Sequence, residues 1–321
     1  MALNLLRYHY QNQCAWGVLE HGQIYPLKID ESTTDTTAAV IRLGIQGIQQ
    51  LVNREMALPL DAVELLSPIT SEQKIICQGA NYRQHMIDSG MNPDEKNFNM
   101  FFTKSSASIH APVGAIAKPK HVQLLDYEIE LCLILKQDID HQVSVNGSNL
   151  HEYVAGICIG NDISARDVQI PQTQFYKGKS YRSFCPLGPI LCLLEAHEMH
   201  YLQQMNLSLK VNGAARQQDS SANMVFKPAE TLSEMSQVFN FRAGDVVMTG
   251  TPSGCALSIP SPLLVKISGL LPEHKKWEIF IKKQKATGRY LNIGDVLELQ
   301  IQSADGKIDL GTQRHTVEFL K

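Results

Sequence analysis

The sequence predicts an α+β fold that is mainly β, with some helices and a small N-terminal domain. Short apolar runs of strand length recur along the chain, Gly, Pro and Asn residues interrupt them, and helical periodicity is confined to a few segments. The regular alternation of strands and helices that is typical of a parallel α/β sheet is missing. A chain of 321 residues is long enough for one large and one smaller domain.

Residues 1–68 are expected to form the small N-terminal domain. Two short strands are predicted around a turn at His21-Gly22, because apolar residues flank this pair on both sides. The segment 36–52 then places its apolar residues at helical spacing, although two glycines, one of them Gly44, weaken that helix.

Residues 69–321 are expected to form the main, β-rich domain. Apolar runs at 74–78, 128–135 and 245–250 have the length of buried strands, and Asn212-Gly213 predicts a tight turn. The lysine-rich segment 258–288 is predicted to be a solvated hairpin, since residues 277–281 alternate like a strand. The alternative is a rim element that attracts a carboxylate substrate or packs on a partner subunit.

Composition favours a small-molecule enzyme. The formal net charge of -3 gives no global basic field that would attract nucleic acid or an anionic membrane. No apolar run approaches the length of a membrane span, and the N-terminus turns polar too early for a signal peptide, so a cytoplasmic location is expected. The seven cysteines lack a Cys-x-x-Cys pair and are interpreted as reduced residues, most of them in the core.

The segment Asp126-Tyr-Glu-Ile-Glu-Leu is the most informative one. On a strand, Glu128 and Glu130 point to the same side at the start of an apolar run. Two buried carboxylates repel each other unless a cation compensates them, and carboxylate oxygens suit Mg²⁺, Mn²⁺ or Ca²⁺. The alternative is a strand with a solvated polar face.

A third carboxylate, Asp162, follows the apolar strand that is predicted to end at Asn161. Asp162 is a candidate third ligand, and a helix N-cap is the alternative. Arg166 and Asp167 are interpreted as a possible local ion pair.

Three further segments carry candidate site residues. If residues 79–88 begin a helix, His85 and Asp88 share a face, where the carboxylate orients the imidazole as a general base. Lys179, predicted to lie in a loop, is a candidate for stabilising an oxyanion, and an inert solvated lysine is the alternative. The turn at 249–254 offers backbone N–H groups and the Thr251 hydroxyl to an anion, but it lacks the lysine of a nucleotide-binding loop.

The order of the motifs resembles the fumarylacetoacetate hydrolase family. Six motifs occur in sequence: Gly-x-Asn-Tyr-x-x-His at 79–85, Phe-Thr-Lys at 102–104, Tyr-Glu-x-Glu-Leu at 127–131, Asn-Asp-x-Ser-Ala-Arg-Asp at 161–167, Gly-Lys-Ser at 178–180 and Gly-Thr-Pro-x-Gly at 250–254. The likeness resumes at 290–299. It implies a mixed β-sheet roll that assembles as a homodimer.

The resemblance also implies roles for individual residues. Glu128, Glu130 and Asp162 match the family's ligands for Mg²⁺ or Mn²⁺. The remaining matches are His85 as the general base with Asp88 in place of the usual Glu, Lys179 as the active-site lysine, and Tyr82, Gln169 and Thr251 as residues that contact the substrate.

The activity implied is hydrolysis of a C–C bond in a 1,3-dicarbonyl compound such as an acylpyruvate, through a metal-stabilised enolate. Decarboxylation, tautomerisation or isomerisation of a 2-oxoacid is the alternative, because it needs the same enolate but no attacking water. A metal-binding scaffold without turnover is a further alternative. The expected ligand is a small anionic dicarbonyl or 2-oxoacid.

Overall fold

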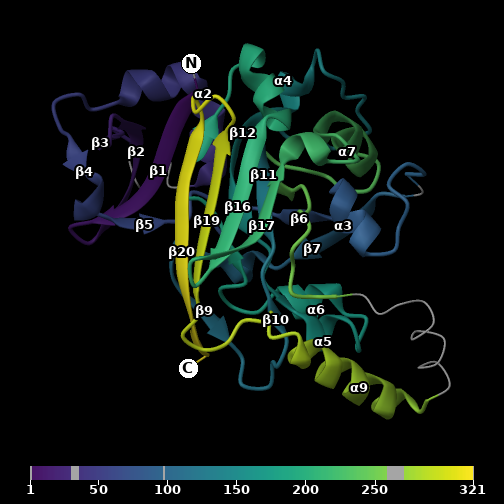
Figure 1. Ribbon diagram of the computed structural model, residues 1–321. Coiled ribbons are helices and arrows are strands. Elements are labelled where there is room, and N and C mark those ends of the chain that lie inside the picture. The colour runs from purple at the N-terminus through teal and green to yellow at the C-terminus, as the bar shows by residue number, and fades with distance from the viewer. Residues whose placement is uncertain (1, 30–35, 97, 259–270, 321) are drawn as a thin grey trace.

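Two mixed β-sheets pack face to face and form the body of the molecule (Figure 1). The computed structural model describes residues 2–29, 36–96, 98–258 and 271–320. The larger sheet contains, in spatial order, β4 (Leu58–Pro59), β3 (Gln23–Pro26), β2 (Gln13–Glu20), β1 (Leu3–Tyr10), β15 (Leu191–Leu193), β12 (Val154–Asn161), β11 (Ile129–Leu135), β18 (Val246–Met248), β6 (Ile75–Gly79) and β7 (Met100–Lys104), with β5 (Glu64–Leu66) paired to β1.

The second sheet has five strands, and two small ladders flank the two sheets. The five strands are β17 (Ala214–Ser220), β16 (Met205–Val211), β19 (Val296–Ser303), β20 (Asp309–Phe319) and β9 (Val113–Lys118). The small ladders join β10 (Leu125–Asp126) to β13 (Ser164–Ala165) and β14 (Cys185–Pro186) to β8 (Ile109–His110).

Short helices connect these strands. They are α2 (Thr37–Leu51), α3 (Arg83–Asp88), α4 (Leu150–Tyr153), α5 (Arg166–Gln169), α6 (Phe175–Lys179), α7 (Pro228–Met235) and α9 (Glu273–Ala286), with 3₁₀ turns at Leu60–Ala62, Ser106–Ser108, Ala196–Gln203 and Ser221–Asn223. The many strands and the few, mostly short helices confirm the predicted α+β class. None of the helices in the described ranges combines the length and apolar character needed to cross a bilayer.

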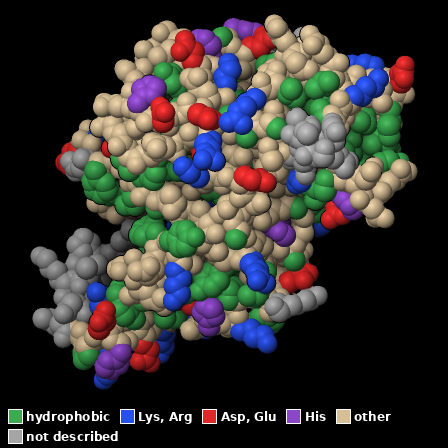
Figure 2. Space-filling model, turned by 180° about the vertical axis from the view of Figure 1, so that it is seen from behind, with side chains coloured by type: hydrophobic (Ala, Val, Ile, Leu, Met, Phe, Trp, Pro, Cys, Tyr) green, Lys and Arg blue, Asp and Glu red, His purple; other side chains and the backbone are tan. Residues whose placement is uncertain are grey.

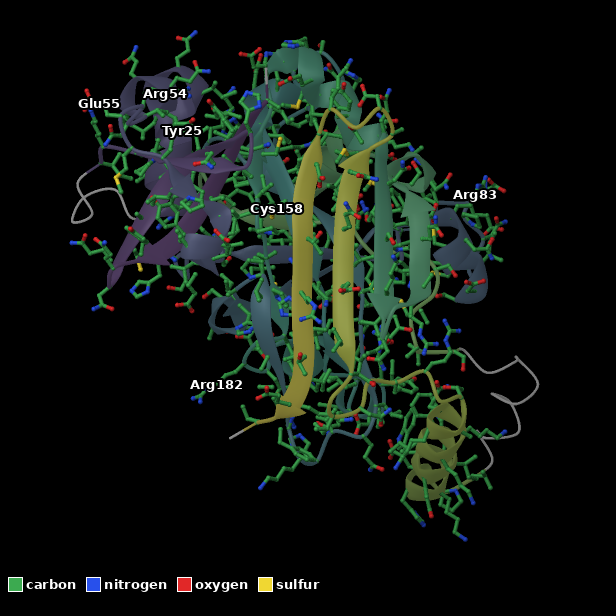
Figure 3. All side chains as sticks on the ribbon, turned by 60° about the vertical axis from the view of Figure 1, so that its left-hand side comes forward. Tyr25, Arg54, Glu55, Arg83, Cys158 and Arg182 are labelled. Carbon is green, nitrogen blue, oxygen red and sulfur yellow. The ribbon has the colours of Figure 1, made fainter. Side chains whose placement is uncertain are left out.

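The strands β11 and β12 lie at the centre of the large sheet and are buried on both faces. Along β11, Leu131 and Leu133 point to the core between the two sheets, whereas Cys132 and Ile134 point to a second core that α2 covers. Figure 3 labels Cys158, which lies opposite Cys132 on β12. All seven cysteines are free thiols, and six of them are buried, which agrees with their interpretation as reduced residues.

The N-terminal predictions of secondary structure are confirmed. β2 and β3 meet at His21-Gly22, where both residues have positive φ, and α2 is interrupted at Gly44, whose φ is 65°. β1 pairs with β15 in an antiparallel register that sets Leu5 opposite Leu191, so the first strands extend the large sheet.

The predicted strand at residues 277–281 is wrong, because this segment is the middle of helix α9. Trp277, Phe280 and Ile281 are spaced as i, i+3 and i+4, and the Trp277 and Phe280 rings meet edge to face at 5.9 Å. The lysines on either side of these residues, at 275, 276, 282 and 283, are good helix formers, which favours the helix over the alternating pattern. Lys266, at the start of the same lysine-rich segment, lies outside the described residues.

Candidate active site

Strand register brings three carboxylates together at one end of the large sheet. β11 begins where its antiparallel partner β12 ends, so that Glu130 is opposite Gly160 and Ile129 is opposite Asn161. Asp162 follows directly, and its backbone N–H donates to the Glu128 carbonyl at 2.8 Å. Asp162 therefore lies directly after the last residue of β12 and does not cap a helix, which was the alternative considered from the sequence.

The three carboxylates form one compact buried group. Ligand oxygens of Glu128, Glu130 and Asp162 all lie within 4.8 Å of one another, and the three residues are 5%, 2% and 0% exposed. Glu130 accepts a hydrogen bond from the Gly250 backbone N–H at 2.7 Å. Because Gly250 follows β18, a third strand of the same sheet holds this ligand group in place.

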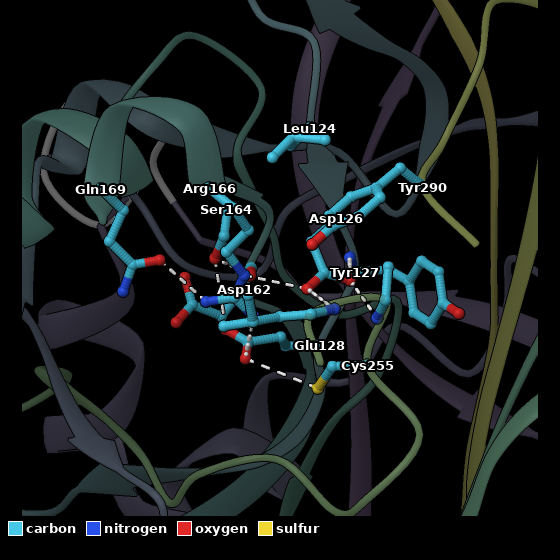
Figure 4. Close-up of polar contacts among 12 residues, drawn as sticks. Leu124, Asp126, Tyr127, Glu128, Asp162, Ser164, Arg166, Gln169, Cys255 and Tyr290 are labelled. Atoms are coloured by element: carbon cyan, nitrogen blue, oxygen red, sulfur yellow. Dashed lines mark hydrogen bonds and ion pairs between the residues drawn. The ribbon is translucent and has the colours of Figure 1, made fainter. Parts of the chain in front are cut away.

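Buried cations contact Glu128 and Asp162, and Figure 4 labels one of them, Arg166, beside these carboxylates. Lys104 Nζ lies 2.5 Å from Asp162 Oδ1, and Lys179 Nζ lies 2.6 Å from Glu128 Oε2 while also contacting Asp162. Arg166 donates from Nη2 to Glu128 Oε1 at 2.6 Å and from Nε to Asp126 Oδ2 at 2.9 Å. Arg166 therefore does not form the local pair with Asp167 considered above.

These charges set the protonation of the group. Burial alone would raise the pKa of Glu128, but the charges of Arg166 and Lys179 outweigh it and hold this pKa well below its usual range. For Lys179, burial lowers the pKa, and the charges of Asp162 and Glu128 more than reverse this effect. Burial raises the pKa of Glu130 well above its usual range, and the charges of Asp162 and Glu128 add to this shift.

The residues fit a hard divalent cation. They supply three convergent carboxylate oxygens in a buried position, and oxygen donors are what Mg²⁺ and Mn²⁺ prefer. Glu130 has no ion pair with a Lys or Arg side chain within the described part of the chain. A bound cation would compensate this carboxylate, for which the protein itself provides only a backbone donor.

A pocket of about 460 Å³ opens next to this group. Its walls include Glu128, Arg166, His85, Cys255, Ser258 and Arg289. A ring nitrogen of His85, a carboxylate oxygen of Glu128 and Sγ of Cys255 lie within 4.8 Å of one another. Burial lowers the pKa of His85, which leaves the imidazole neutral and able to accept a proton near neutral pH.

The predicted pairing of His85 with Asp88 is not found. Both residues lie on α3 as expected, but the exposed Asp88 carboxylate accepts hydrogen bonds from Gln84 Nε2 at 2.8 Å and from the Ser253 hydroxyl. No hydrogen bond joins Asp88 to His85 among the described residues. An i, i+3 spacing places two side chains on one face of a helix, but it does not decide which partners they choose.

The other predicted site residues are Lys179, Gln169, Thr251 and Tyr82. Each of them either forms hydrogen bonds within the protein or is buried. Lys179 ends helix α6 instead of lying in a loop. The side-chain oxygen Oε1 of Gln169 accepts from Arg166 Nη1 at 2.8 Å, and the Thr251 hydroxyl donates to the Ile129 backbone carbonyl at 2.9 Å. Tyr82 is fully buried. Gln169, Thr251 and Tyr82 therefore support the walls of the site in this structure.

Sequence reasoning missed five residues of the site: Lys104, Asp126, Arg166, Cys255 and Arg289. Lys104 and Arg166 are part of two of the six motifs on which the resemblance rests, and that membership was the signal that could have identified them. No pattern pointed to Arg289, because it reaches the pocket from a segment more than 100 residues away in sequence from Glu128, Asp162 and Lys179.

Comparison with known proteins finds a family model that covers most of the chain. A family model described as the C-terminal domain of fumarylacetoacetate (FAA) hydrolase matches residues 74–318. The chain is 33% identical over 209 residues to oxaloacetate tautomerase YisK of Bacillus subtilis (strain 168), covering 64% of this chain and 68% of that protein. It is 32% identical over 212 residues to human mitochondrial oxaloacetate tautomerase FAHD2A, covering 65% of each, so about two thirds of these relatives is aligned.

Solved structures share the fold along almost the whole chain. A fumarylacetoacetate hydrolase from Exiguobacterium antarcticum is 27% identical with a TM-score of 0.74, and the match covers 99% of both chains. A probable 2-hydroxyhepta-2,4-diene-1,7-dioate isomerase from Mycobacterium abscessus is 29% identical with a TM-score of 0.72, again over 99% of both. This chain therefore belongs to the fumarylacetoacetate hydrolase family.

Proposed function

We propose that this protein catalyses the keto–enol tautomerisation of a 2-oxoacid of the oxaloacetate type, with Mg²⁺ or Mn²⁺ held by Glu128, Glu130 and Asp162. The observation that carries the proposal is the buried group of three carboxylates at the wall of a pocket that also contains His85. Sequence similarity to oxaloacetate tautomerases over about two thirds of the chain supports the choice of reaction.

The reaction moves one proton. The C3–H bond of the 2-oxoacid breaks, a C2–C3 double bond forms, and the C2 oxygen gains a proton; the reverse steps regenerate the ketone. A divalent cation at the three carboxylates would act as a Lewis acid that lowers the cost of negative charge on the C2 oxygen. The half-buried His85 is placed to take and return the C3 proton, because its ring reaches the pocket beside Glu128.

The buried cations hold the ligands in position. Lys179 bridges Glu128 and Asp162, and Lys104 approaches Asp162 from a second strand. Both lysines also bring positive charge close to the place where an enolate oxygen would lie. Breaking such a buried network is expected to lower activity through loss of ligand geometry.

Hydrolysis of a C–C bond in an acylpyruvate stays the second candidate. The same pocket has room for a water molecule beside a small substrate, and His85 would serve as the base that activates it. The argument for hydrolysis from an Asp88–His85 pair is weaker in this structure, because Asp88 contacts Gln84 and Ser253.

A turnover assay on metal-stripped protein tests these candidates. The substrates are enol-oxaloacetate, keto-oxaloacetate, fumarylpyruvate and an acylpyruvate, each with and without added Mg²⁺ or Mn²⁺. We expect metal-restored ketonisation of enol-oxaloacetate, and a fall of about 10²- to 10⁴-fold in kcat for His85→Gln. His200→Gln, an exposed histidine outside the pocket, is the matched control and is expected to keep full activity.

Cleavage of the acylpyruvate without tautomerisation would replace the proposal with the hydrolase function. Decarboxylation of oxaloacetate that persists in His85→Gln would indicate a different 2-oxoacid reaction at the same ligands. Metal binding without turnover of any substrate would leave a non-catalytic scaffold. The homodimer, the absence of nucleic-acid and membrane partners and the cytoplasmic location stay predictions, and light scattering of the purified chain tests the first.

A further inference from the structure

The lysine-rich segment 258–288 starts and ends at the active-site pocket. Ser258, its first residue, and Arg289, the residue that follows it, both line the pocket. Gln284 is the buried residue of α9, only 3% exposed, and ties these ends together. Its side-chain amide donates to the Ser258 carbonyl at 2.6 Å, and its oxygen accepts from the Tyr290 hydroxyl at 2.7 Å.

This anchoring fixes the direction of Arg289. Helix α9 ends at Ala286 with Thr287 as its C-cap, and Gly288, whose φ is 64°, then turns the chain back toward the body of the protein. One guanidinium nitrogen of Arg289 donates to the Gly254 carbonyl at 2.8 Å, which places the group over the loop that follows β18. Leu291 N then donates to the Leu125 carbonyl at 2.9 Å, so both sides of Arg289 are attached to the site.

Arg289 forms no ion pair with a carboxylate in the described part of the chain, although its charge is close enough to Asp88 to help lower the pKa of that carboxylate. A single side-chain hydrogen bond leaves most of the five N–H donors of Arg289 unused. Asp88, which lines the same pocket, directs its carboxylate to Gln84 and Ser253 instead. The pocket therefore contains a half-buried guanidinium group that is free to bind an anion.

The inner cations cannot serve this purpose. Lys104, Lys179 and Arg166 lie against Asp162, Glu128 and Asp126, so their charges are already compensated by carboxylates of the protein. The carboxylate next to the carbonyl of a 2-oxoacid would be compensated by the divalent cation that Glu128, Glu130 and Asp162 would hold. A second carboxylate, farther along the substrate, needs another cation, because burying an unpaired charge is costly.

We infer that Arg289, held by Gln284 of the lysine-rich segment, is the specificity-determining residue that binds the second carboxylate of a 2-oxo dicarboxylic acid. The inference rests on the proposed function for the reacting end of the substrate. A guanidinium group suits this task because it forms two parallel hydrogen bonds with a carboxylate. None of the lysines in the described part of the segment lines the pocket, so the inference assigns the contact with the carboxylate to Arg289 and leaves the rim role of the lysines as the alternative it was.

A pair of ligands that differ only in the second carboxylate tests the inference without turnover. Malate and lactate share a 2-hydroxycarboxylate, and malate adds one carboxylate; binding of each to the full chain with saturating Mg²⁺ is measured by calorimetry. We expect the wild type to bind malate roughly 10- to 100-fold more tightly than lactate, the range of a charge-assisted hydrogen-bonded pair. Arg289→Gln should abolish this preference, and Arg289→Lys should retain part of it.

Steady-state kinetics supply the second readout. For oxaloacetate, Arg289→Gln should raise KM roughly 10- to 100-fold with little change in kcat, whereas the 4-methyl ester of oxaloacetate should be unaffected. Gln284→Ala should raise KM for oxaloacetate and leave the ester unchanged, which a general loss of structure would not do. Lys283→Gln, an exposed charge removal on the same helix, is the matched control.

The outcomes separate this inference from the proposed function. If oxaloacetate is turned over and Arg289→Gln leaves both KM and the malate preference unchanged, the inference is overturned and the proposed function stands. If no 2-oxoacid is turned over but the malate preference exists and disappears in Arg289→Gln, the inference holds and the reaction is wrong. A wild type that binds malate and lactate equally also overturns the inference.

Discussion

Glu130 differs from the two carboxylates beside it, although all three are buried in the same group. Glu128 and Asp162 contact lysine or arginine side chains, whereas the Glu130 carboxylate accepts from a backbone N–H. Its pKa is raised well above the usual range, chiefly by burial and then by the charges of Asp162 and Glu128. The metal-free protein therefore favours a protonated Glu130, while metal binding requires the ionised form.

Replacing Glu130 by glutamine is expected to have opposite effects with and without metal. A folded-state pKa above the unfolded value means that the protonated form stabilises the protein at low pH, and that this stability is lost as pH rises through the folded pKa. Glu130→Gln mimics the protonated form, so metal-free protein at pH 8 should gain stability toward urea. Mg²⁺ affinity should fall by at least about 10-fold, since even indirect changes around metal ligands cost that much. Equal loss of stability and affinity would contradict this account.

At the scale of elements, β20 carries a buried histidine far from the catalytic group in sequence. His315 is 1% exposed, and its ring centre lies 6.0 Å from that of His110 on β8. Neither ring nitrogen of His315 has a hydrogen-bond partner in the part of the chain that the structure describes. Burial, with a smaller contribution from the His110 charge, lowers the pKa of His315 to about 3.

His315 is therefore expected to make β20 acid-sensitive. In the unfolded chain this side chain takes up a proton near pH 6.5, the ordinary pKa of a histidine, but in the folded protein it does so only near pH 3. Stability is thus lost as pH falls from 6.5 toward 3, by about 3 kcal/mol at pH 4 for a single group with this shift. Urea unfolding at pH 7 and pH 4 should show a smaller difference for His315→Leu than for wild type. His141→Leu, at an exposed histidine, should leave the difference unchanged.

For helix α9, the spacing of apolar residues was not sufficient to distinguish a helix from a strand. The residues 277–281 fit both an alternating strand and a helical face, and both interpretations were compatible with the apolar positions. The contact between Gln284 and Ser258, 26 residues apart in sequence, is one that the pattern of apolar residues does not contain. Figure 3 shows α9 projecting from the two sheets, and Phe280 and Ile281 pack against the main core.

For the molecule as a whole, acidic and basic side chains are interspersed on the face that Figure 2 shows. The charges of the candidate site are concentrated inside the protein, at one end of the large sheet. They comprise four carboxylates and three cations: Asp126, Glu128, Glu130, Asp162, Lys104, Lys179 and Arg166. With all seven groups ionised, four negative and three positive charges leave one negative charge unmatched, so a divalent cation is expected to stabilise the entire fold.

Mg²⁺ is expected to raise the melting temperature of metal-stripped protein. A ligand present at 100 times its Kd adds about 2.7 kcal/mol to the free energy of unfolding. For a chain of 321 residues, with an unfolding entropy of about 2.1 cal/mol/K per residue, that corresponds to about 4 °C. Calorimetric scans with EDTA and with Mg²⁺ should show the shift in wild type and in Glu195→Gln, which alters the acidic group Glu195–His197–Glu198 outside the pocket. The shift should disappear in Asp162→Asn, and a shift that persists there would place the metal elsewhere.

The resemblance to the family, the α+β class and most local elements follow from the sequence alone. Apolar runs and turn residues indicate the strands, because side-chain burial and positive φ are local requirements. The sequence also predicted Glu128, Glu130 and Asp162 as candidate metal ligands, from the cost of acidic residues beside buried strands and from the resemblance to the family, and the structure brings these three side chains together.

How the side chains of the site pair with one another becomes defined in the tertiary structure. Asp88 contacts Ser253, Arg166 contacts Glu128 and Asp126, and Arg289, which directly follows the segment predicted to be a solvated hairpin, lines the pocket. Sequence spacing limits which residues share a strand or helix face, but hydrogen-bond partners are chosen across elements. That choice depends on strand register and burial, which become defined only when the two sheets pack.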